Sequence, residues 1–210
     1  MKEKIKKIYF RIFGKIRAKK FDFTDFTIIS NNCFGGIVYR NHHLPYLTPT
    51  AGLFIMPKDY IKFIYNLKYY LSITPIEIKI DESTYSNYLK TLNYDGVIGK
   101  IDDVELMFLH YEDFNEAKTK WERRKKRVNF DKIIYKFNDQ NNCTIEELRL
   151  FEEFPAKNKI LFTAKEYDGV ESYVLNKYEA AGYVVDDTKT KNIKTVFNIY
   201  DFVNSINISE

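Results

Sequence analysis

The chain has 210 residues, a length that favours one domain with at most a small appendage. Apolar residues make up 45% of it, which is enough for a hydrophobic core. Its two cysteines, Cys33 and Cys143, form no CxxC pair, which excludes a disulfide scaffold and a cysteine-rich zinc site. The net charge of +4 is uneven, because residues 1–20 hold nine Lys or Arg and one Glu and the rest is net acidic.

The first 20 residues predict a basic amphipathic helix that precedes a single α/β domain over residues 21–210. Apolar residues recur there at spacings of three and four, with basic residues on the other faces: Ile5, Ile8, Tyr9, Ile12, Phe13 and Ile16. A helix of this kind is suited to lie on an anionic membrane surface. The alternatives are an ordinary first helix that packs its apolar stripe on the domain, and a contact with nucleic acid.

No apolar run has the length of a signal-peptide core, and none approaches the ~20 residues that span a bilayer. Two cysteines without a disulfide pattern fit a reducing compartment. We therefore expect a cytoplasmic protein, which residues 1–20 hold peripherally on the inner membrane face.

From Phe26 onward, short apolar runs alternate with helical patterns. The runs typical of strands cover residues 26–30, 75–80, 95–101, 104–111, 132–137 and 159–164. Helical patterns cover residues 57–71, 113–128, 144–154 and 198–206. Thr144 and Glu147 predict a capping box, and Asp102 with Asp103 predicts the turn of one antiparallel hairpin. The alternation predicts an α/β fold with a largely parallel sheet and helices on both of its faces.

The stretch IISNNCFGG, which ends at Gly36, marks the end of the first strand. An apolar run that stops at small polar residues is typical of a strand's carboxyl end, where ligands bind in α/β proteins. We expect Asn31, Asn32 and Cys33 to open onto a cleft, with Gly35 and Gly36 letting the backbone approach a ligand closely. Cys33 is a candidate nucleophile if a base lies nearby. The alternative is a small hydrophobe that ends a core strand.

His110 ends a later strand, in the segment MFLHYED. If that strand runs parallel to the first, His110 lies at the same sheet edge as Cys33 and can serve as its base, since Cys–His pairs are neighbours in space and not in sequence. The alternative is a partly buried histidine bonded to a backbone carbonyl. His42 and His43 have no Asp or Glu at ligand spacing, so we expect no metal site there.

The helical pattern over residues 113–128 carries dense positive charge. Lys120, Arg124 and Arg127 fall at i, i+4 and i+7, on one face. Trp121 lies beside them and can pack, or cover a sugar or base ring. Arginine pairs bind diphosphates bidentately, which suits coenzyme A, nucleotide sugars and lipid diphosphates. The alternative is a solvated basic face.

Four stretches together resemble one bacterial family: IISNNCFGG, TPTAGLFIMPKDYIKFIYNLKYYL, HY followed by EAKTKWERRKKRVN, and KILFTAKEY. It is a domain-of-unknown-function family whose members are commonly labelled exopolysaccharide biosynthesis proteins. The likeness runs from about Phe26 to Val185, and Phe34 stands where the family usually has tryptophan. The resemblance implies an α/β fold and a role in cell-surface polysaccharide assembly, but no particular reaction. The positions that fill its motifs are Asn31, Asn32, Cys33, Gly35, Gly36, His110, Lys120, Trp121, Arg123, Arg124 and Arg127.

Three classes of function fit these features. The first is a transferase that builds or modifies exopolysaccharide, capsule or another surface glycan. It would use acyl-coenzyme A or a nucleotide sugar as co-substrate, a glycan or lipid-linked acceptor, and no tightly bound cofactor. The second is a non-catalytic module that binds a glycan or lipid-linked precursor at the inner membrane surface. The third, a nucleic-acid binder, is disfavoured because residues 21–210 are net acidic and hold no known binding motif.

Three sequence motifs that mark large enzyme classes do not occur in the chain. They are GxxxxGK[ST], GxGxxG and DxD, which mark P-loop ATPases, dinucleotide-binding enzymes and one class of metal-dependent glycosyltransferases. The sequence therefore disfavours these three classes.

Overall fold

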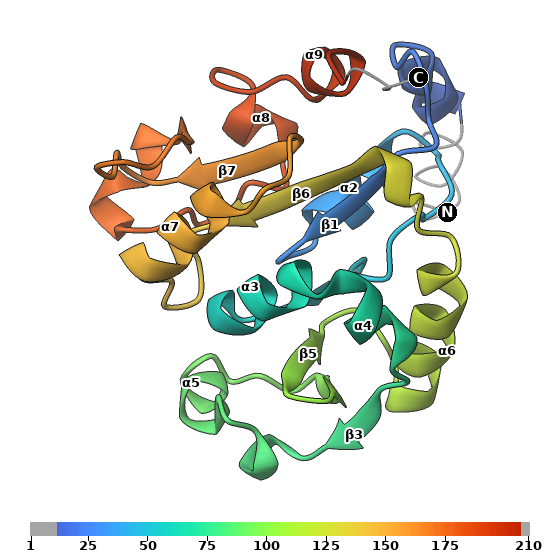
Figure 1. The fold of residues 1–210 in the computed structure, drawn as a ribbon, viewed down its shortest axis with the longest axis vertical. Helices are drawn as coiled ribbons and strands as arrows, with labels where there is room; N and C mark the ends of the chain where they lie inside the picture. Colours follow the sequence, from blue (N-terminus) through green and yellow to red (C-terminus); the bar gives the residue numbers. More distant parts are fainter. Residues whose placement is uncertain (1–11, 207–210) are drawn as a thin grey trace, which may run out of the picture.

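The computed structural model describes residues 12–206, in which the strands form two four-stranded sheets (Figure 1). The first sheet is parallel throughout, in the order β1 (Thr27–Ser30), β6 (Ile133–Asn138), β7 (Lys159–Thr163), β8 (Tyr173–Val174). The second is antiparallel, in the order β2 (Leu53–Phe54), β5 (Val104–Phe108), β4 (Val97–Ile101), β3 (Ile76–Ile78). The predicted α/β fold and hairpin are confirmed, and the hairpin belongs to a second sheet that the sequence did not indicate.

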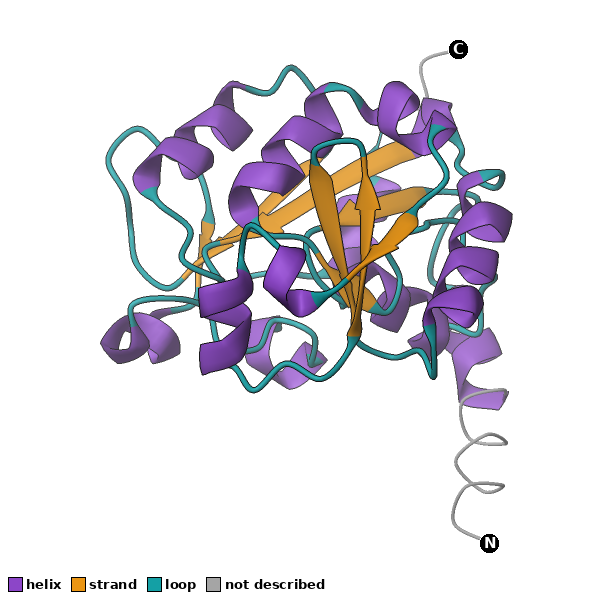
Figure 2. Ribbon diagram, turned by 90° about the horizontal axis from the view of Figure 1, so that it is seen from below, coloured by secondary structure: helices purple, strands orange, loops and turns teal. Residues whose placement is uncertain are grey.

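Helices cover both faces of the parallel sheet, because successive residues of its buried strands point to opposite sides. Ile28 packs in a core with residues of α2 (Phe34–Asn41) and of the C-terminal helices α8 (Thr190–Ile193) and α9 (Ile199–Asn204). Ile29 faces the other way, toward α3 (Pro57–Tyr65) and α7 (Ile145–Glu153). Figure 2 shows the strands in the interior and the helices around them.

The antiparallel sheet shares a core with the parallel sheet through α3, which lies between them in Figure 1. The Tyr60 hydroxyl on α3 donates a hydrogen bond to the Ile29 carbonyl of β1 (2.8 Å). Strands β4 and β5 join at Asp102, whose φ of 54° is the left-handed conformation that tight hairpin turns require. The far face of this sheet packs on Leu89 of α5 (Ser86–Thr91).

The remaining helices follow the sequence patterns with shifted ends. The pattern over residues 57–71 becomes two helices, because Asn66 leaves helical geometry (φ −128°) between α3 and α4 (Leu67–Ser72). Helix α6 (Phe114–Lys125) ends three residues before its pattern does. The capping box of α7 is present, with Thr144 N–H donating to Glu147 (2.8 Å). Short 3-10 helices are η1 (Ile80–Glu82), η2 (Phe130–Lys132) and η3 (Asn176–Ala181).

The N-terminal segment is helical over residues 12–18 and contacts the domain on one side. At Gly14 a Cβ atom would lie 2.8 Å from that of His43, so this glycine allows the close approach. Ile12, Phe13 and Ile16 are about half exposed, at 51%, 48% and 55%. The rest of the predicted stripe, Ile5, Ile8 and Tyr9, lies outside the described residues. No helix within residues 12–206 is long and apolar enough to cross a membrane.

Candidate functional site

The carboxyl ends of β1 and β6 lie side by side, because the two strands pair in parallel with Ser30 opposite Lys136. The side chains at these ends bond to one another. Asn31 donates to the Asn138 side-chain oxygen (2.8 Å), and Asn138 donates to Asp187 (2.7 Å). Asn32 donates to the other Asp187 oxygen (2.9 Å). The expected edge of the sheet is therefore polar, but its asparagines are held by protein partners.

A fully buried ion pair lies at the centre of this polar cluster. Lys136 Nζ lies 2.5 Å from Asp187, and both side chains are 0% exposed. The ammonium also donates to the side-chain oxygens of Asn31 (3.3 Å) and Asn32 (3.1 Å). Burial lowers the pKa of Lys136, against the effect of Asp187. The pair is fully hydrogen-bonded, as a buried pair must be to persist, and it fixes the shape of the segment that leads into Cys33.

Cys33 occupies the N-cap position of α2 without a capping hydrogen bond from its side chain, and it is partly exposed. Gly35 and Gly36 lie inside the first turn of this helix and not in a loop. A Cβ at Gly35 would lie 3.1 Å from Ile28 of β1, and one at Gly36 would lie 3.1 Å from the Cβ of Ala51. The two glycines therefore allow close helix packing. Gly36 also lines a cavity, described next, whereas Gly35 is buried against the strand.

Cys33 and His110 line one cavity of about 290 Å³, which we call the cationic cavity. Its defining residues are Cys33, Arg40, His110, Tyr111, Lys120 and Arg124. Of the described residues that line it, none is acidic. The Cys33 thiol donates to the Leu53 carbonyl (3.8 Å) and not to His110, whose backbone N–H donates to the Gly52 carbonyl (3.3 Å). The structure thus brings the two predicted residues to one cavity without a direct hydrogen bond.

Two of the predicted cations of α6 reach the cationic cavity, Lys120 and Arg124. Arg124 is 8% exposed and donates to the Ala51 carbonyl (3.0 Å) and the Tyr111 hydroxyl (2.7 Å). Its guanidinium also lies 4.7 Å from the Tyr46 ring centre. The buried Nε has no hydrogen-bond partner within residues 12–206. Lys120 is more open and pairs with Glu116 (2.5 Å).

The other predicted members of this helix lie elsewhere. Trp121 is 1% exposed and packs on Phe63, so it does not cover a ligand ring in the cationic cavity. Arg123 is exposed on the helix, and Arg127 is exposed beyond its end at Lys125. Neither arginine lines the cavity. The i, i+4, i+7 pattern fails at its third position because α6 ends two residues before Arg127.

The environment of Cys33 keeps the thiol protonated at neutral pH. Burial raises the pKa of Cys33 to about 11, and the charge of Asp187 adds to the rise. Lys136 and Arg40 act in the opposite direction, but less strongly than burial. Because the thiolate is the reactive form, a nucleophilic role requires that the proton pass to a base as the new bond forms.

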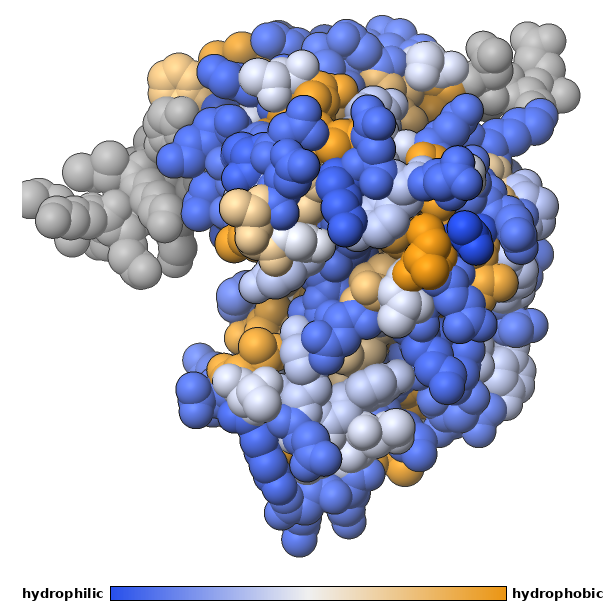
Figure 3. All heavy atoms as spheres, turned by 90° about the vertical axis from the view of Figure 1, so that its left-hand side faces the viewer, coloured by the Kyte–Doolittle hydropathy of each residue, from blue (hydrophilic) through white to orange (hydrophobic). Residues whose placement is uncertain are grey.

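Cys33 also lines a second cavity, of about 550 Å³, which we call the polar cavity. It lies between loops that belong to the two sheets. Its wall holds amide, carboxylate and phenol side chains, from Asn32, Tyr88, Gln140, Asn142, Tyr183 and Asp187. Figure 3 shows the left-hand side of Figure 1, at which the carboxyl ends of the parallel strands lie. The surface on this side is hollowed. The predicted cleft at the sheet's carboxyl edge thus corresponds to this cavity, although Asn31 does not reach it.

Sequence reasoning missed several residues of the site. Asn138 and Gln140 belong to the segment FNDQNN, which ends a strand in small polar residues just as SNN does at Asn31. This similarity was a usable signal. No local sequence signal marked Lys136 and Asp187, because their ion pair joins a strand to a segment that lies 51 positions later.

Comparison with known proteins places the chain in a family. The model of a domain of unknown function, DUF1919, matches residues 4–208. The chain belongs to the DUF1919 family. The match includes most of residues 1–20, which the sequence resemblance had left out. The chain is also 29% identical over 184 residues to a protein of Haemophilus influenzae named only as uncharacterized, covering 86% of this chain and 84% of that protein.

Proposed function

We propose that this DUF1919 protein is a transferase in the assembly of bacterial exopolysaccharide, capsule or another cell-surface glycan. One observation carries the proposal: Cys33 lies in the wall of both the cationic cavity and the polar cavity. A residue between two cavities of different chemistry can contact a donor in one and an acceptor in the other.

The cationic cavity suits the phosphates of an activated donor, either acyl-coenzyme A or a nucleotide sugar. Arg40, Lys120 and Arg124 lie in its wall, and none of its described lining residues would repel an anion. Arginine presents planar donors that match phosphate oxygens, and Lys120 adds a flexible charge.

The polar cavity suits the acceptor glycan. Amide side chains both donate and accept hydrogen bonds, as sugar hydroxyl groups do, and Asn32, Gln140 and Asn142 supply them. Tyr88 and Tyr183 add large rings that carry a hydroxyl, a combination typical of sites that bind partly apolar, partly polar ligands.

In the acyl-transfer form of the proposal, His110 accepts the Cys33 proton while the sulfur attacks the thioester carbonyl of the donor. The bond to the coenzyme A sulfur breaks, and His110 returns the proton to that sulfur. A glycan hydroxyl then attacks the acyl-Cys33 thioester and the acyl–sulfur bond breaks, so that the hydroxyl proton passes to the released Cys33 thiolate and the acylated glycan leaves. In the glycosyl-transfer form, Cys33 contacts the donor and forms no covalent bond.

The experiment that tests this chemistry is intact-mass measurement after incubation with acetyl-coenzyme A. We expect an acetyl adduct that is lost in Cys33→Ser and retained in Cys143→Ser, a matched control at the other half-buried cysteine. His110→Gln should slow adduct formation. If no adduct forms but a nucleotide sugar is consumed with glycan acceptor, the glycosyl form holds. If neither happens, the transferase proposal is wrong.

The alternative is a non-catalytic module that binds a glycan or lipid-linked precursor on the cytoplasmic side of the membrane, and one observation agrees with it. Ile12, Phe13 and Ile16 expose apolar surface on a helix that also exposes Lys15, and Lys19 is exposed just beyond its end. Apolar and basic side chains together suit the headgroup layer of an anionic bilayer. Peripheral attachment through residues 1–20 is compatible with both functions, so only the transfer assays separate them.

A further inference from the structure

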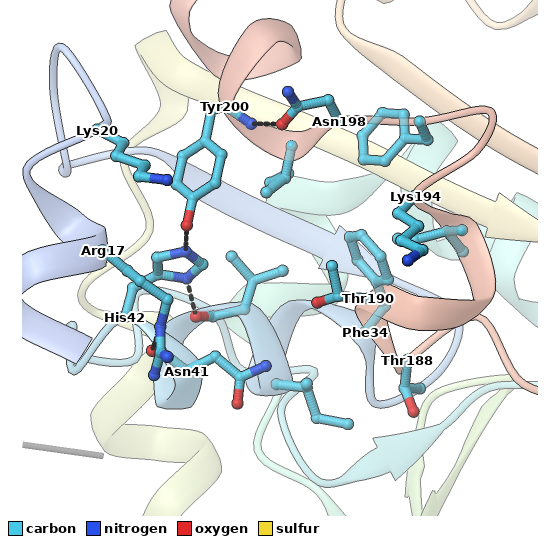
Figure 4. A pocket seen from close by; sticks show the side chains of 15 residues that line it. Arg17, Lys20, Phe34, Asn41, His42, Thr188, Thr190, Lys194, Asn198 and Tyr200 are labelled. Atoms are coloured by element: carbon cyan, nitrogen blue, oxygen red, sulfur yellow. Dashed lines mark hydrogen bonds between the residues drawn. The ribbon is translucent and has the colours of Figure 1, made fainter. Parts of the chain in front are cut away.

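A third cavity lies on the other side of α2, and neither the donor nor the glycan of the proposed reaction accounts for it. It has a volume of about 550 Å³ and lies between the N-terminal segment, α2 and the C-terminal helices. We call it the amphipathic cavity (Figure 4). One part of its wall is apolar, formed by Phe34, Val38, Ile193, Phe197 and Ile199.

The charged side chains of the amphipathic cavity are all basic. Arg17 and Lys20 lie on one side of it and Lys194 on the other (Figure 4). Of the described residues that line the cavity, none is acidic. His42 adds no charge at neutral pH, because burial lowers its pKa more than the bond to the Val38 carbonyl (2.8 Å) raises it. Its other ring nitrogen bonds to the Tyr200 hydroxyl (2.9 Å).

The cations are held in position by the fold. Arg17 Nε donates to the Asn41 carbonyl at the end of α2 (2.9 Å). Lys20 Nζ lies 5.2 Å from the centre of the Tyr200 ring, and the side chain of Asn204 donates to the Lys20 carbonyl (2.9 Å). Positive charge at the rim of an apolar hollow complements a ligand with an anionic head and a hydrocarbon chain.

The amphipathic cavity adjoins both cavities of the proposed reaction. Thr188 lines it and the polar cavity, and Ile37 lines it and the cationic cavity. The three cavities therefore surround the first two turns of α2. A group carried on a ligand in the amphipathic cavity can extend past Thr188 toward Cys33.

We propose that the amphipathic cavity binds the phosphate ester of a long-chain alcohol, with the phosphate at Arg17 and Lys20 and the chain against Phe34, Phe197 and Ile199. The role of this phosphate ester as the carrier of the glycan acceptor rests on the proposed transferase function, but its binding in the cavity does not. The exposed stripe at Ile12 and Ile16 is on the segment that supplies Arg17 and Lys20, so the cavity and the proposed membrane contact lie on neighbouring parts of the chain.

The test is calorimetric binding of alkyl phosphates to the full chain, below their micelle concentrations. We expect dodecyl phosphate to bind, with affinity rising about fourfold for each methylene added from octyl to dodecyl. Dodecyl maltoside, which has the chain without the charge, and inorganic phosphate, which has the charge without the chain, should both bind at least tenfold more weakly. Equal binding of either probe would contradict the proposal, and so would an absence of chain-length dependence.

Matched variants connect the binding to this cavity. Lys20→Glu should weaken dodecyl phosphate binding about tenfold, since it reverses one charge at the rim, while Lys19→Glu at the neighbouring exposed position, which does not line the cavity, should change it less than twofold. Ile199→Asp places a carboxylate in the wall at the first turn of α9, where a helix tolerates it, and Val196→Asp is its exposed control. If test and control variants lose equal affinity for dodecyl phosphate, the ligand binds nonspecifically to the basic surface and not in the amphipathic cavity.

Other outcomes separate this proposal from its rivals. If Ile199→Asp converts a dimer of the protein to a monomer, the hollow is an interface between copies and the ligand proposal is wrong. If dodecyl phosphate does not bind while acetyl-coenzyme A still acylates Cys33, only the amphiphile site fails. If it binds and neither form of transfer occurs, the proposed function fails and the site stands.

Discussion

Cys33 immediately precedes α2 and lies between two cavities, and burial together with Asp187 raises its pKa to about 11. Below that pH, the thiolate fraction rises about tenfold per pH unit. In Cys143→Ser protein we therefore expect the rate of iodoacetamide alkylation at Cys33 to climb steadily from neutral pH and to level off near 11. A cysteine peptide, which levels off near its ordinary pKa of about 8.5, is the control. A plateau near neutral pH would show an activated thiolate in the free protein.

Lys136 and Asp187 form the buried ion pair beside Cys33. Removing one partner leaves the other charge uncompensated, which typically costs about 3–5 kcal/mol. We expect Lys136→Met to lower the free energy of unfolding by this amount in urea. The double variant Lys136→Met/Asp187→Asn should recover at least half of the loss, because it leaves no uncompensated charge and the amide oxygen still accepts one of the two hydrogen bonds that Asp187 accepts from Asn32 and Asn138. A double variant as unstable as the single one would contradict the electrostatic cause.

The residues at the end of β1 could be read from the sequence because small polar residues stop an apolar run there. Lys136 could not, since it occupies the segment KIIYKF, where one lysine after a tyrosine reads as an exposed position of an alternating strand. Its complete burial depends on Asp187, which reaches it only through the folded chain. Charged residues that are paired in the interior leave no local pattern.

At the scale of helices and strands, features set by neighbouring residues could be predicted from the sequence, whereas the pairing of distant strands could not. The Thr144 capping box and the turn at Asp102 are set by neighbours within a few residues, and both are present. The antiparallel sheet depends on β2, which has two residues, Leu53–Phe54, and pairs with β5 more than fifty positions later. Such a short strand has no periodicity to detect.

Helix α6 supplies two cations to the cationic cavity, the buried Arg124 and the partly exposed Lys120. Because their surroundings differ, we expect their replacement to change the free energy of unfolding by different amounts. Arg124→Ala removes hydrogen bonds to the Ala51 carbonyl and the Tyr111 hydroxyl from a buried position, so we expect a loss of about 2 kcal/mol or more in unfolding free energy. Lys120→Ala removes a partly exposed i, i+4 pair with Glu116, which contributes about 0.5 kcal/mol or less.

Urea unfolding of both α6 variants measures the difference, with Arg123→Ala as an exposed control on the same helix. If Arg124→Ala is as stable as that control, the hydrogen bonds of Arg124 do not support the fold. The role of Arg124 would then be ligand binding and not stabilisation of the fold. The stability of Arg124→Ala must be known before any loss of donor binding in it is interpreted.

Across the whole molecule, the exposed apolar residues Ile12, Phe13 and Ile16 form the surface that the proposed membrane contact would use. We expect the full chain to sediment with anionic vesicles at low salt and not with zwitterionic ones. Ile12→Asp/Ile16→Asp should abolish sedimentation without changing the melting temperature, because both side chains are about half exposed, at 51% and 55%. The control Ile76→Asp/Phe130→Asp alters exposed apolar residues elsewhere and should still sediment. Equal sedimentation of both variants would exclude the stripe.

The most direct test of donor binding beside Cys33 is thermal unfolding with coenzyme A, acetyl-coenzyme A and nucleotide sugars. A ligand at 100 times its dissociation constant adds about 2.7 kcal/mol, which raises the melting temperature by several degrees in a chain of this size. We expect such a shift with at least one donor in the unaltered protein and in Lys118→Glu, and its loss in Lys120→Glu, which reverses a charge in the cationic cavity. Absence of a shift with every donor, or an undiminished shift in Lys120→Glu, would contradict binding at this site.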